Sequence, residues 1–481
     1  MTNVVELLEP ADRLALVAPG GQALSYAELR EQVGQAAGGL AGLGVAPGDR
    51  VLLLVPMGID LYISLLALFH LGATAMLVDP SGPMDDILQR YPPVGLIGSA
   101  KAHLLRLKHP ALRGLDLQIS TGFTPLAHRR LSRLRGPTPA VSPGGHPALL
   151  TFTTGTTGVP KAIARSHDFL GAQHRVLAGH MALGPGDVDL PTLPVFLLHS
   201  LASGATCVIP DADLRAVGQV DPDPVLQQIE AHGVSSTSGS PAFFQRLADR
   251  LEQTGRTLDG LRHVFAGGAR VPSGLIDQLA RVAPNAALHI VYGSTEAEPI
   301  AVLDARTHRD RLAAAEAGGK GALVGTPVPD IQVRIDAQAG QPGEILVAGP
   351  HVNPGYLDDP EAEARTKVHE GDTTWHRTGD AGFLDAAGEL WLVGRVGEEV
   401  AGLWPLMAEG AAERLDFVRR AGLAAVDGAP VIAVELLDPP ADWRAQIQGA
   451  SGARPVEVRE VPVDPRHNAK VDRGRLAALL A

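Results

Sequence analysis

The segment 152–161 combines side chains and glycines that could together bind phosphate. It reads Phe-Thr-Thr-Gly-Thr-Thr-Gly-Val-Pro-Lys, so a tight glycine turn can direct backbone amides at an anion while neighbouring hydroxyls donate. Lys161 adds a positive charge. Only two residues separate Gly155 from Gly158, which differs from the G-x-x-x-x-G-K-[ST] spacing. The pattern predicts a phosphate-binding loop of another kind, with a flexible surface loop as the alternative.

Three further segments carry groups suited to a nucleotide. Residues 291–299, Val-Tyr-Gly-Ser-Thr-Glu-Ala-Glu-Pro, follow an apolar run at 288–291, where the carboxyl end of a strand could meet a nucleotide. Residues 264–270 form an apolar strand that leads into Gly267 and Gly268. In residues 375–395, Asp380 occupies a Thr-Gly-Asp turn in which a carboxylate can accept ribose hydroxyls, and Arg395 can bind ribose or phosphate. Ordinary turns are the alternative for the first two segments.

The elements that must position these groups alternate between helices and apolar strands. Helices are expected at 25–43, 58–71, 224–232 and 275–282, and strands at 50–55, 74–78, 206–210 and 288–291. Strands without polar alternation between helices predict parallel sheets that are covered on both faces. A hairpin turn is expected at 385–388. A domain boundary is expected near 395–398, with a small unit at the C-terminus.

Composition and charge limit the class of protein. The chain has 481 residues, so more than one core is expected. The net charge of −12 argues against nucleic-acid or membrane-surface binding, and the single cysteine excludes an internal disulfide. The apolar window at 63–78 is interrupted and predicts a buried helix and strand rather than a membrane span. The N-terminus has no basic region typical of a signal peptide, so a cytoplasmic location is expected.

In their order along the chain, these motifs resemble those of the adenylate-forming superfamily of acyl-CoA synthetases, peptide-synthetase adenylation domains and luciferases. The resemblance implies an α/β fold with a large N-terminal domain (1–395) of stacked, mostly parallel sheets and covering helices. A small, mobile α+β domain (396–481) would carry the catalytic lysine, Lys470, in the segment Pro465-Arg-His-Asn-Ala-Lys. ATP and Mg²⁺ would be required, with a small carboxylic acid as substrate.

The resemblance also implies a role for each motif residue. Lys470, Glu296 and Thr154 would be catalytic, and Glu296 would hold Mg²⁺. Tyr292 would stack near adenine, with Gly267, Gly268 and Ala269 lining the adenine pocket, and Thr295 would contact the α-phosphate. The remaining nucleotide-binding candidates are Thr153, Gly155, Thr156, Thr157, Gly158, Lys161, Gly293, Ser294, Asp380 and Arg395.

Departures from the superfamily pattern narrow the expected reaction. After Arg395 the usual loop that helps form a thioester is replaced by Val-Gly-Glu-Glu-Val-Ala-Gly-Leu-Trp-Pro, which places Gly397 at the hinge position. Leu197 stands where a histidine or aromatic residue is common. These features resemble the β-lactone synthetases of olefin and natural-product biosynthesis, which would convert a 3-hydroxy acid through its acyl-AMP into a β-lactone.

Several alternatives and open points accompany this hypothesis. An acyl- or aryl-CoA ligase is the other enzymatic interpretation, and an inactive nucleotide-binding or carrier-protein-interacting module is a third. The general base for the second step is not identified; His199 and His232 are candidates only because histidine can do this work. Upstream or downstream biosynthetic enzymes are expected partners, and the sequence does not define the oligomeric state or the acid.

Overall fold

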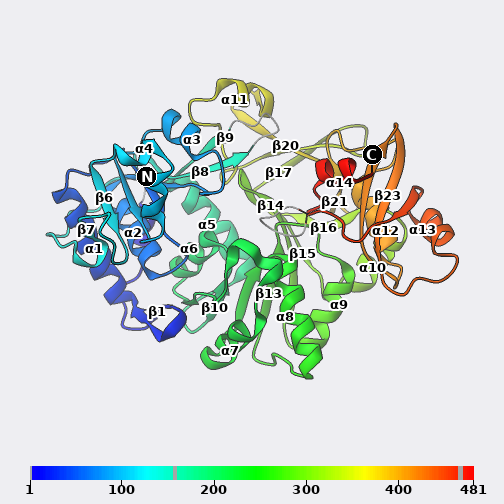
Figure 1. The fold of residues 1–481 in the computed structure, drawn as a ribbon, viewed down its shortest axis with the longest axis horizontal. Helices are drawn as coiled ribbons and strands as arrows, with labels where there is room; N and C mark the ends of the chain where they lie inside the picture. Colours follow the sequence, from blue (N-terminus) through cyan, green and yellow to red (C-terminus); the bar gives the residue numbers. More distant parts are fainter. Residues whose placement is uncertain (1–2, 155–159, 464–469, 481) are drawn as a thin grey trace. The chain divides into compact units, whose positions relative to one another are not determined.

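Two units make up the chain, and each contains both strands and helices (Figure 1). The computed structural model describes residues 3–154, 160–463 and 470–480. The first unit comprises Met1–Pro210 and Pro350–Lys367, and the second comprises Asp211–Gly349 and Val368–Ala481. The expected boundary near residue 395 therefore falls inside the second unit.

The first unit contains a sheet with the strand order β7-β6-β5-β3-β4-β8-β9. Its pairs are parallel from β7 to β8, as the unbroken apolar strands predict, and β8–β9 alone among them is antiparallel. The bounds are β3 (Arg50–Leu54), β4 (Thr74–Leu77), β5 (Gly95–Gly98), β6 (Leu117–Ser120), β7 (Arg129–Arg130), β8 (Pro147–Thr154) and β9 (Pro160–Ser166).

A second group of strands in the first unit runs β10-β11-β1-β2, with β1–β11 and β10–β11 parallel and β1–β2 antiparallel. These strands are β1 (Leu14–Val17), β2 (Ala23–Ser25), β10 (Val188–Pro191) and β11 (Thr206–Val208). The helices of this unit are α1 (Tyr26–Gly42), α2 (Ile59–Leu71), α3 (Met84–Arg90), α4 (Pro110–Arg113), α5 (His167–Met181), α6 (Pro194–Ala202) and α11 (Pro360–Thr366). Short 3-10 helices are η1 (Val4–Leu7), η2 (Pro19–Gly21), η3 (Ala102–Leu107) and η4 (Leu131–Arg133).

Local sequence signals account for the ends of the first two helices. At the start of α1, the Ser25 hydroxyl accepts from the Glu28 amide at 3.1 Å, and the Glu28 carboxylate accepts from the Ser25 amide at 2.7 Å. This capping box satisfies two amides that the helix itself leaves unpaired. Helix α2 is buried along nearly its whole length and ends at Gly72, as expected for the apolar window. Side chains of α1, α2 and β3 share one hydrophobic core.

The second unit contains a long mixed sheet with the order β17-β18-β20-β21-β16-β15-β14-β13-β12, with β19 beside β20. Pairing is parallel through β12, β13 and β14 and antiparallel from β14 to β17. The expectation of mostly parallel strands therefore holds for only part of this sheet.

The strands of this sheet are β12 (Ser236–Gly239), β13 (His263–Gly267), β14 (Ala287–Ser294), β15 (Ala297–Asp304), β16 (Ala322–Pro327), β17 (Gln332–Asp336), β18 (Gly343–Ala348), β19 (Lys367–Glu370), β20 (Thr373–Leu384) and β21 (Leu390–Arg395). The helices that precede residue 396 in this unit are η5 (Leu214–Gln219), α7 (Pro222–His232), α8 (Pro241–Thr254), α9 (Ser273–Val282) and α10 (Arg309–Ala317). The expected helices at 224–232 and 275–282 correspond to α7 and α9, each of which begins two residues earlier than expected.

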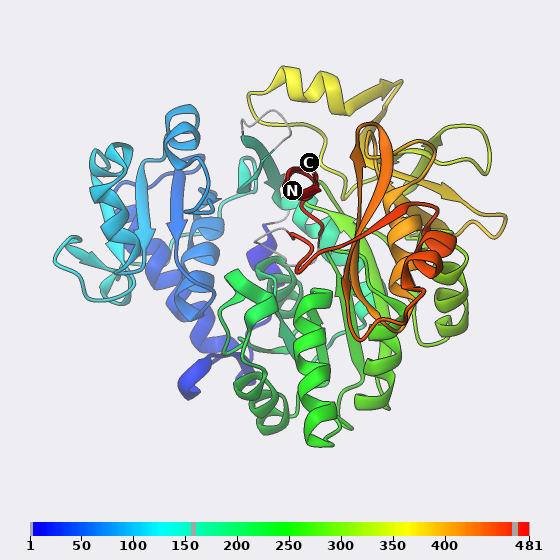
Figure 2. The same cartoon turned by 45° about the vertical axis from the view of Figure 1, so that its right-hand side comes forward.

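The C-terminal part of the second unit has its own three-stranded sheet, β22-β23-β24 (Figure 2). Its elements are α12 (Pro405–Glu413), β22 (Val418–Val426), β23 (Ala429–Leu436), α13 (Trp443–Ser451), β24 (Arg454–Glu457) and α14 (Arg473–Leu480). Helices α12 and α13 share one apolar cluster with this sheet, and Leu476 of α14 joins a second cluster with Ala424 and Ala433. This part of the chain thus buries apolar side chains of its own.

The helices that the structure describes include none with the length and apolar character required to cross a bilayer. The apolar window at 63–78, for example, is divided between α2 and β4.

Candidate active site

The predicted phosphate loop connects two antiparallel strands of the first unit, β8 and β9. Across this ladder Thr153 pairs with Lys161, and Thr154 pairs with Pro160. The candidates Gly155, Thr156, Thr157 and Gly158 lie outside the described residues. Lys161 therefore lies opposite Thr153 near the end of this antiparallel pair.

Lys161 has a defined aromatic neighbour. Its Nζ lies 5.2 Å from the ring centroid of Tyr356, within the range of a cation–π contact. Tyr356 forms a backbone bridge with Ile163 of β9, and the amide of Leu357 donates to the carbonyl of Ala162 at 3.0 Å. The segment around Tyr356 therefore continues the sheet edge beside Lys161, a neighbour that the sequence did not indicate.

The glycine pair predicted for the adenine pocket lies where β13 ends. Gly267 is the last residue of β13 and pairs with Val291 of the parallel strand β14. A Cβ atom at Gly267 would lie 2.6 Å from the Val291 carbonyl oxygen, so no larger residue fits there. Gly268 and Ala269 follow in the loop. The carboxyl ends of neighbouring parallel strands are the place where α/β sheets bind nucleotides.

The segment that begins with Tyr292 was expected to follow its strand, and this placement is wrong. Strand β14 continues through Ser294, so Tyr292, Gly293 and Ser294 are strand residues, and only Thr295 and Glu296 form the turn into β15. The reason is the antiparallel pairing with β15, which the single-strand pattern could not reveal.

Glu296 is the candidate magnesium ligand at this turn. Its side chain is partly buried, and its amide donates to the Ser294 hydroxyl at 3.3 Å. The described residues include no group of three or more His, Cys, Asp or Glu side chains that could hold a metal ion. A single carboxylate fits Mg²⁺, because that ion is usually bound by one or two carboxylates together with phosphate oxygens of the substrate.

The structure brings Asp380, Arg395 and Tyr292 together. Arg395 pairs with Asp380 across the β20–β21 ladder, and its Nη1 donates to Asp380 Oδ1 at 2.7 Å. The Tyr292 hydroxyl donates to Asp380 Oδ2 at 2.7 Å. A carboxylate has about four lone-pair sites, so this one keeps acceptor capacity for ribose hydroxyls. Burial, followed by the Asp380 charge, raises the pKa of Tyr292 well above its usual value, so the phenol is protonated and donates.

Asp380 was expected in a turn, and this expectation is also wrong. Thr378, Gly379 and Asp380 lie inside the long strand β20. Gly379 has a φ of 70°, in the left-handed region, which makes a local irregularity in that strand. A Cβ atom there would lie 2.8 Å from Nη2 of Arg395. The hairpin predicted at 385–388 is confirmed, with Asp385 accepting from the Ala387 amide at 2.9 Å.

Lys470 precedes helix α14 and is exposed. Its neighbour Val471 forms a backbone bridge with Val463, and the Asp472 amide donates to the Pro462 carbonyl at 2.8 Å. The hinge candidate Gly397 is exposed, has a φ of 86°, and has nothing within 4 Å of an added Cβ atom.

No sequence motif assigned a role to the residues that contact the segment carrying Lys470. Arg473 binds the carboxylates of Glu398 and Glu409, and Glu398 directly follows Gly397 in the chain. Its signal in the sequence is an arginine three residues after Lys470, which is too common to assign without a structure.

The two histidines considered as bases differ in their surroundings. His199 is 3% exposed, and its Nδ1 lies 3.0 Å from Nδ1 of His174. Burial, followed by the neighbouring His174, lowers the pKa of His199 to about 3, so this imidazole is neutral near pH 7. His232 is the exposed last residue of α7.

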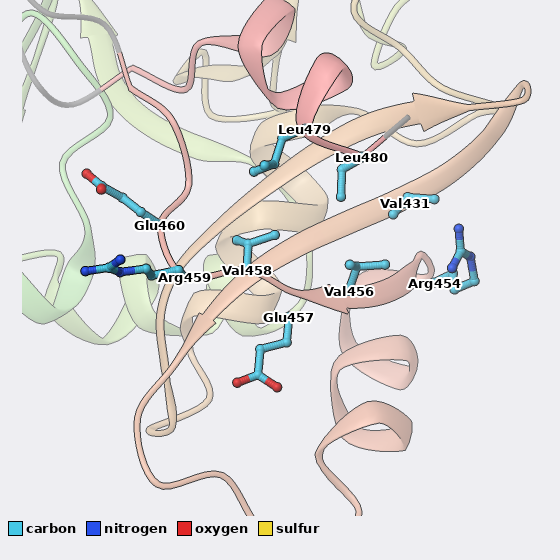
Figure 3. Close-up of a pocket in the computed structure, with 9 residues that line it drawn as sticks. All are labelled: Val431, Arg454, Val456, Glu457, Val458, Arg459, Glu460, Leu479 and Leu480. Carbon is cyan, nitrogen blue, oxygen red and sulfur yellow. The ribbon is translucent and has the colours of Figure 1, made fainter.

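A separate pocket of about 570 Å³ lies in the C-terminal part of the second unit (Figure 3). Apolar side chains of β23, β24 and α14 line it, among them Val431, Val456 and Leu479. None of the predicted site residues is in its lining, so it is distinct from the candidate nucleotide site.

The chain is similar to proteins of known activity along most of its length. Residues 7–357 match the AMP-binding enzyme family. The chain is 34% identical to the olefin beta-lactone synthetase of Stenotrophomonas maltophilia, over 98% of this chain and 95% of that protein. It is 28% identical to 4-coumarate–CoA ligase 5 of Oryza sativa subsp. japonica, over 82% of this chain and 75% of that protein.

Solved structures agree on the fold. The amide bond synthetase McbA from Marinactinospora thermotolerans superposes with a TM-score of 0.85 at 24% identity, covering 99% of each chain. O-succinylbenzoate coenzyme A synthetase from Bacillus subtilis, in complex with AMP, gives a TM-score of 0.80 at 21% identity, covering 99% of this chain and 98% of that one. From the family match and the full-length similarity, the chain belongs to the AMP-binding enzymes and is an adenylate-forming ligase that activates carboxylic acids with ATP.

Proposed function

We propose that this ligase converts a 3-hydroxy acid into a β-lactone. The observation that supports this most strongly is the similarity to olefin beta-lactone synthetases, which covers nearly the whole of both chains. The similarity to 4-coumarate–CoA ligase 5 covers less of the chain, and its sequence identity is lower. The altered segment after Arg395, where superfamily members usually carry the loop that helps form a thioester, points in the same direction.

The first step forms the acyl-adenylate. A carboxylate oxygen of the acid attacks the α-phosphorus of ATP, and pyrophosphate leaves. Thr154, Thr157 and Lys161 bind the phosphates, and the Asp380–Arg395 pair binds the ribose. Lys470 stabilises the charge that develops between acid and α-phosphate. When bound, Mg²⁺ neutralises phosphate charge, and Glu296 is the residue that would hold it.

The second step closes the ring. The β-hydroxyl oxygen attacks the acyl carbonyl carbon of the same molecule and its proton passes to solvent. The bond between the acyl carbon and the phosphate oxygen breaks, and AMP leaves with that electron pair. Because nucleophile and carbonyl are already in one molecule, no second encounter is needed, an advantage of about 7–11 kcal/mol in well-oriented cases. No thiol acceptor takes part in this step.

We further propose that residues 396–481 move as one body about Gly397. The exposed, left-handed backbone of this glycine and the separate apolar clusters that follow it support this division. The movement would carry Lys470 toward and away from the acid and nucleotide.

Incubation with ATP, Mg²⁺ and a panel of 3-hydroxy acids, followed by mass spectrometry, tests the reaction. The expected product is the acid minus one water, formed together with AMP and pyrophosphate in the absence of coenzyme A. Acids of the same length without the hydroxyl are the matched control, and they should stop at the adenylate. Strict dependence on coenzyme A, with a thioester product, would instead show that the protein is an acyl- or aryl-CoA ligase, the activity of the similar 4-coumarate–CoA ligase. ATP binding without pyrophosphate release would favour the inactive module.

A further inference from the structure

Arg473 begins helix α14, three residues after Lys470, and two carboxylates hold its guanidinium. Its Nε lies 2.9 Å from Glu398 Oε2, and its Nη1 lies 2.7 Å from Glu409 Oε1. The same Nη1 donates to the Leu423 carbonyl at 3.0 Å. Arginine suits such a position because its planar donors are fixed relative to one another. The start of α14 is therefore tied to three different parts of the chain.

The contact with Glu409 is part of a buried arrangement. Glu409 lies on α12 with a side chain that is 5% exposed, and its Oε1 also accepts from the Leu423 amide at 2.8 Å. Leu423 thus offers its amide to Glu409 and its carbonyl to Arg473. Burial by itself would lower the pKa of Arg473, and the carboxylates of Glu409 and Glu398 more than offset this effect, so its pKa is raised. The guanidinium is charged and anchored on the C-terminal sheet.

The contact with Glu398 leads to the candidate ribose site. Glu398 directly follows the hinge candidate Gly397, and its Oε2 also accepts from the backbone amide of Arg395 at 3.3 Å. Arg395 in turn binds Asp380 through its side chain at 2.7 Å. A continuous series of polar contacts therefore runs from Asp380 through Arg395 and Glu398 to Arg473.

We infer that Arg473 is a positioning residue for Lys470, and that Glu398 couples this position to the ribose-binding pair Asp380 and Arg395. The inference rests on the proposed role of Lys470 in adenylation. In this arrangement the contact between the Arg395 amide and Glu398 crosses the hinge candidate, and the Glu398–Arg473 ion pair sets where the turn that carries Lys470 lies. A nucleotide whose ribose is bound by Asp380 and Arg395 stabilises the same arrangement. Such binding fixes the position of Arg395 at the end of β21, and the Arg395 amide donates to Glu398.

Glu398→Gln tests the coupling, since it removes the charge and keeps the side-chain volume. Glu399→Gln is the matched control, because Glu399 is the exposed neighbour in the same loop. We expect the kcat of acid-dependent pyrophosphate release to fall about 10-fold to 100-fold in Glu398→Gln, with the KM for ATP changed less than about threefold. Glu399→Gln should leave both constants near those of the wild type. Arg473→Lys, which keeps the charge without the two-pronged geometry, should lower kcat similarly.

The ribose provides a readout that a purely structural role would not change. For the wild type, 2′-deoxy-ATP should give a lower kcat than ATP, because it lacks one hydroxyl that can donate a hydrogen bond to the Asp380 carboxylate. In Glu398→Gln this difference in kcat should shrink, since the connection from the ribose site to Lys470 is broken. The double variant Glu398→Gln/Arg473→Lys should lose little more than either single variant.

Lys470→Ala in the same assay separates this inference from the proposed function. If Lys470→Ala keeps full pyrophosphate release, the role of Lys470 is wrong and the inference fails with it. If Lys470→Ala is inactive but Glu398→Gln matches Glu399→Gln in kcat, only the inference is overturned. The inference is likewise overturned if Glu398→Gln has a lower melting temperature and lower activity, while its preference for ATP over 2′-deoxy-ATP stays at the wild-type value.

Discussion

The hydroxyl of Tyr292 lies 2.7 Å from Oδ2 of Asp380, although 88 residues separate the two in the chain. This contact joins the end of β14 to the middle of β20. Because the phenol donates to the carboxylate, it fixes the orientation in which Asp380 can accept ribose hydroxyls.

Tyr292→Phe should therefore weaken nucleotide binding. A hydrogen bond to a charged group contributes about 1.5–3 kcal/mol, so we expect the KM for ATP to rise roughly tenfold or more. Tyr26→Phe is a matched control, since the buried Tyr26 hydroxyl lies 2.9 Å and 2.8 Å from the carbonyls of Leu201 and Ala205, which are not candidate site residues. Initial rates at varied ATP concentration measure the effect, and an equal KM in the two variants would contradict the ribose assignment.

Lys470→Ala should suppress adenylation while ATP binding stays nearly intact. The ammonium group acts on charge that appears in the transition state, so its loss should lower kcat by about 10²–10³-fold. Acid-dependent exchange of labelled pyrophosphate into ATP measures the step, and calorimetric titration with ATP measures binding. Loss of binding in step with activity would show that Lys470 acts on the ground state.

Gly397→Ala tests the hinge, and the chain offers a close control in Gly402. Their φ values are 86° and 85°, and neither glycine has an atom within 4 Å of an added Cβ atom. Each substitution should cost about 1–2 kcal/mol of folding free energy, because an L-residue is disfavoured in the left-handed region. Only Gly397→Ala should also lower steady-state turnover. Equal melting temperatures with equal turnover in both variants would argue against a hinge at Gly397.

Acid should destabilise the fold through His199. Its pKa is about 3 in the folded state against 6.5 in the unfolded chain, so the unfolded state takes up the proton first. The stability contribution is complete above pH 6.5 and declines as pH falls toward 3, by up to about 1.4 kcal/mol per pH unit. His167, whose pKa burial lowers to about 4, adds to the same trend.

Denaturant titrations between pH 7 and pH 4.5 measure this slope. His199→Gln should flatten the pH dependence of the unfolding free energy, although it also lowers stability by removing the contact with His174. An unchanged slope in the variant would show that His199 is not the group being protonated.

Local patterns in the sequence predicted the elements that local forces decide. The helices expected at 25–43 and 58–71 and the turn expected at 385–388 depend on neighbours a few residues away, and the structure agrees with them to within one residue at the helix ends.

Pairing between distant segments was less accessible to prediction. The extension of β14 through Ser294 and the placement of Asp380 within β20 depend on strands that meet only in the folded chain. The same holds for the ion pairs of Arg473, since a contact between side chains far apart in the chain produces no periodic pattern in the sequence. The sequence motifs identified the candidate functional residues, and the tertiary pairing of strands determines which of them are in contact.

The parallel strands β12, β13 and β14 all direct their carboxyl ends toward the edge where Gly267 and the Thr295–Glu296 turn lie. The connection at Gly255, after α8, leads back to the amino end of β13, and it is exposed. Loops at the amino ends of such strands tolerate added residues, since they lie away from the chemistry. We therefore expect a short handle inserted after Gly255 to leave catalysis unchanged, so this connection is a suitable point for attaching the enzyme to a surface.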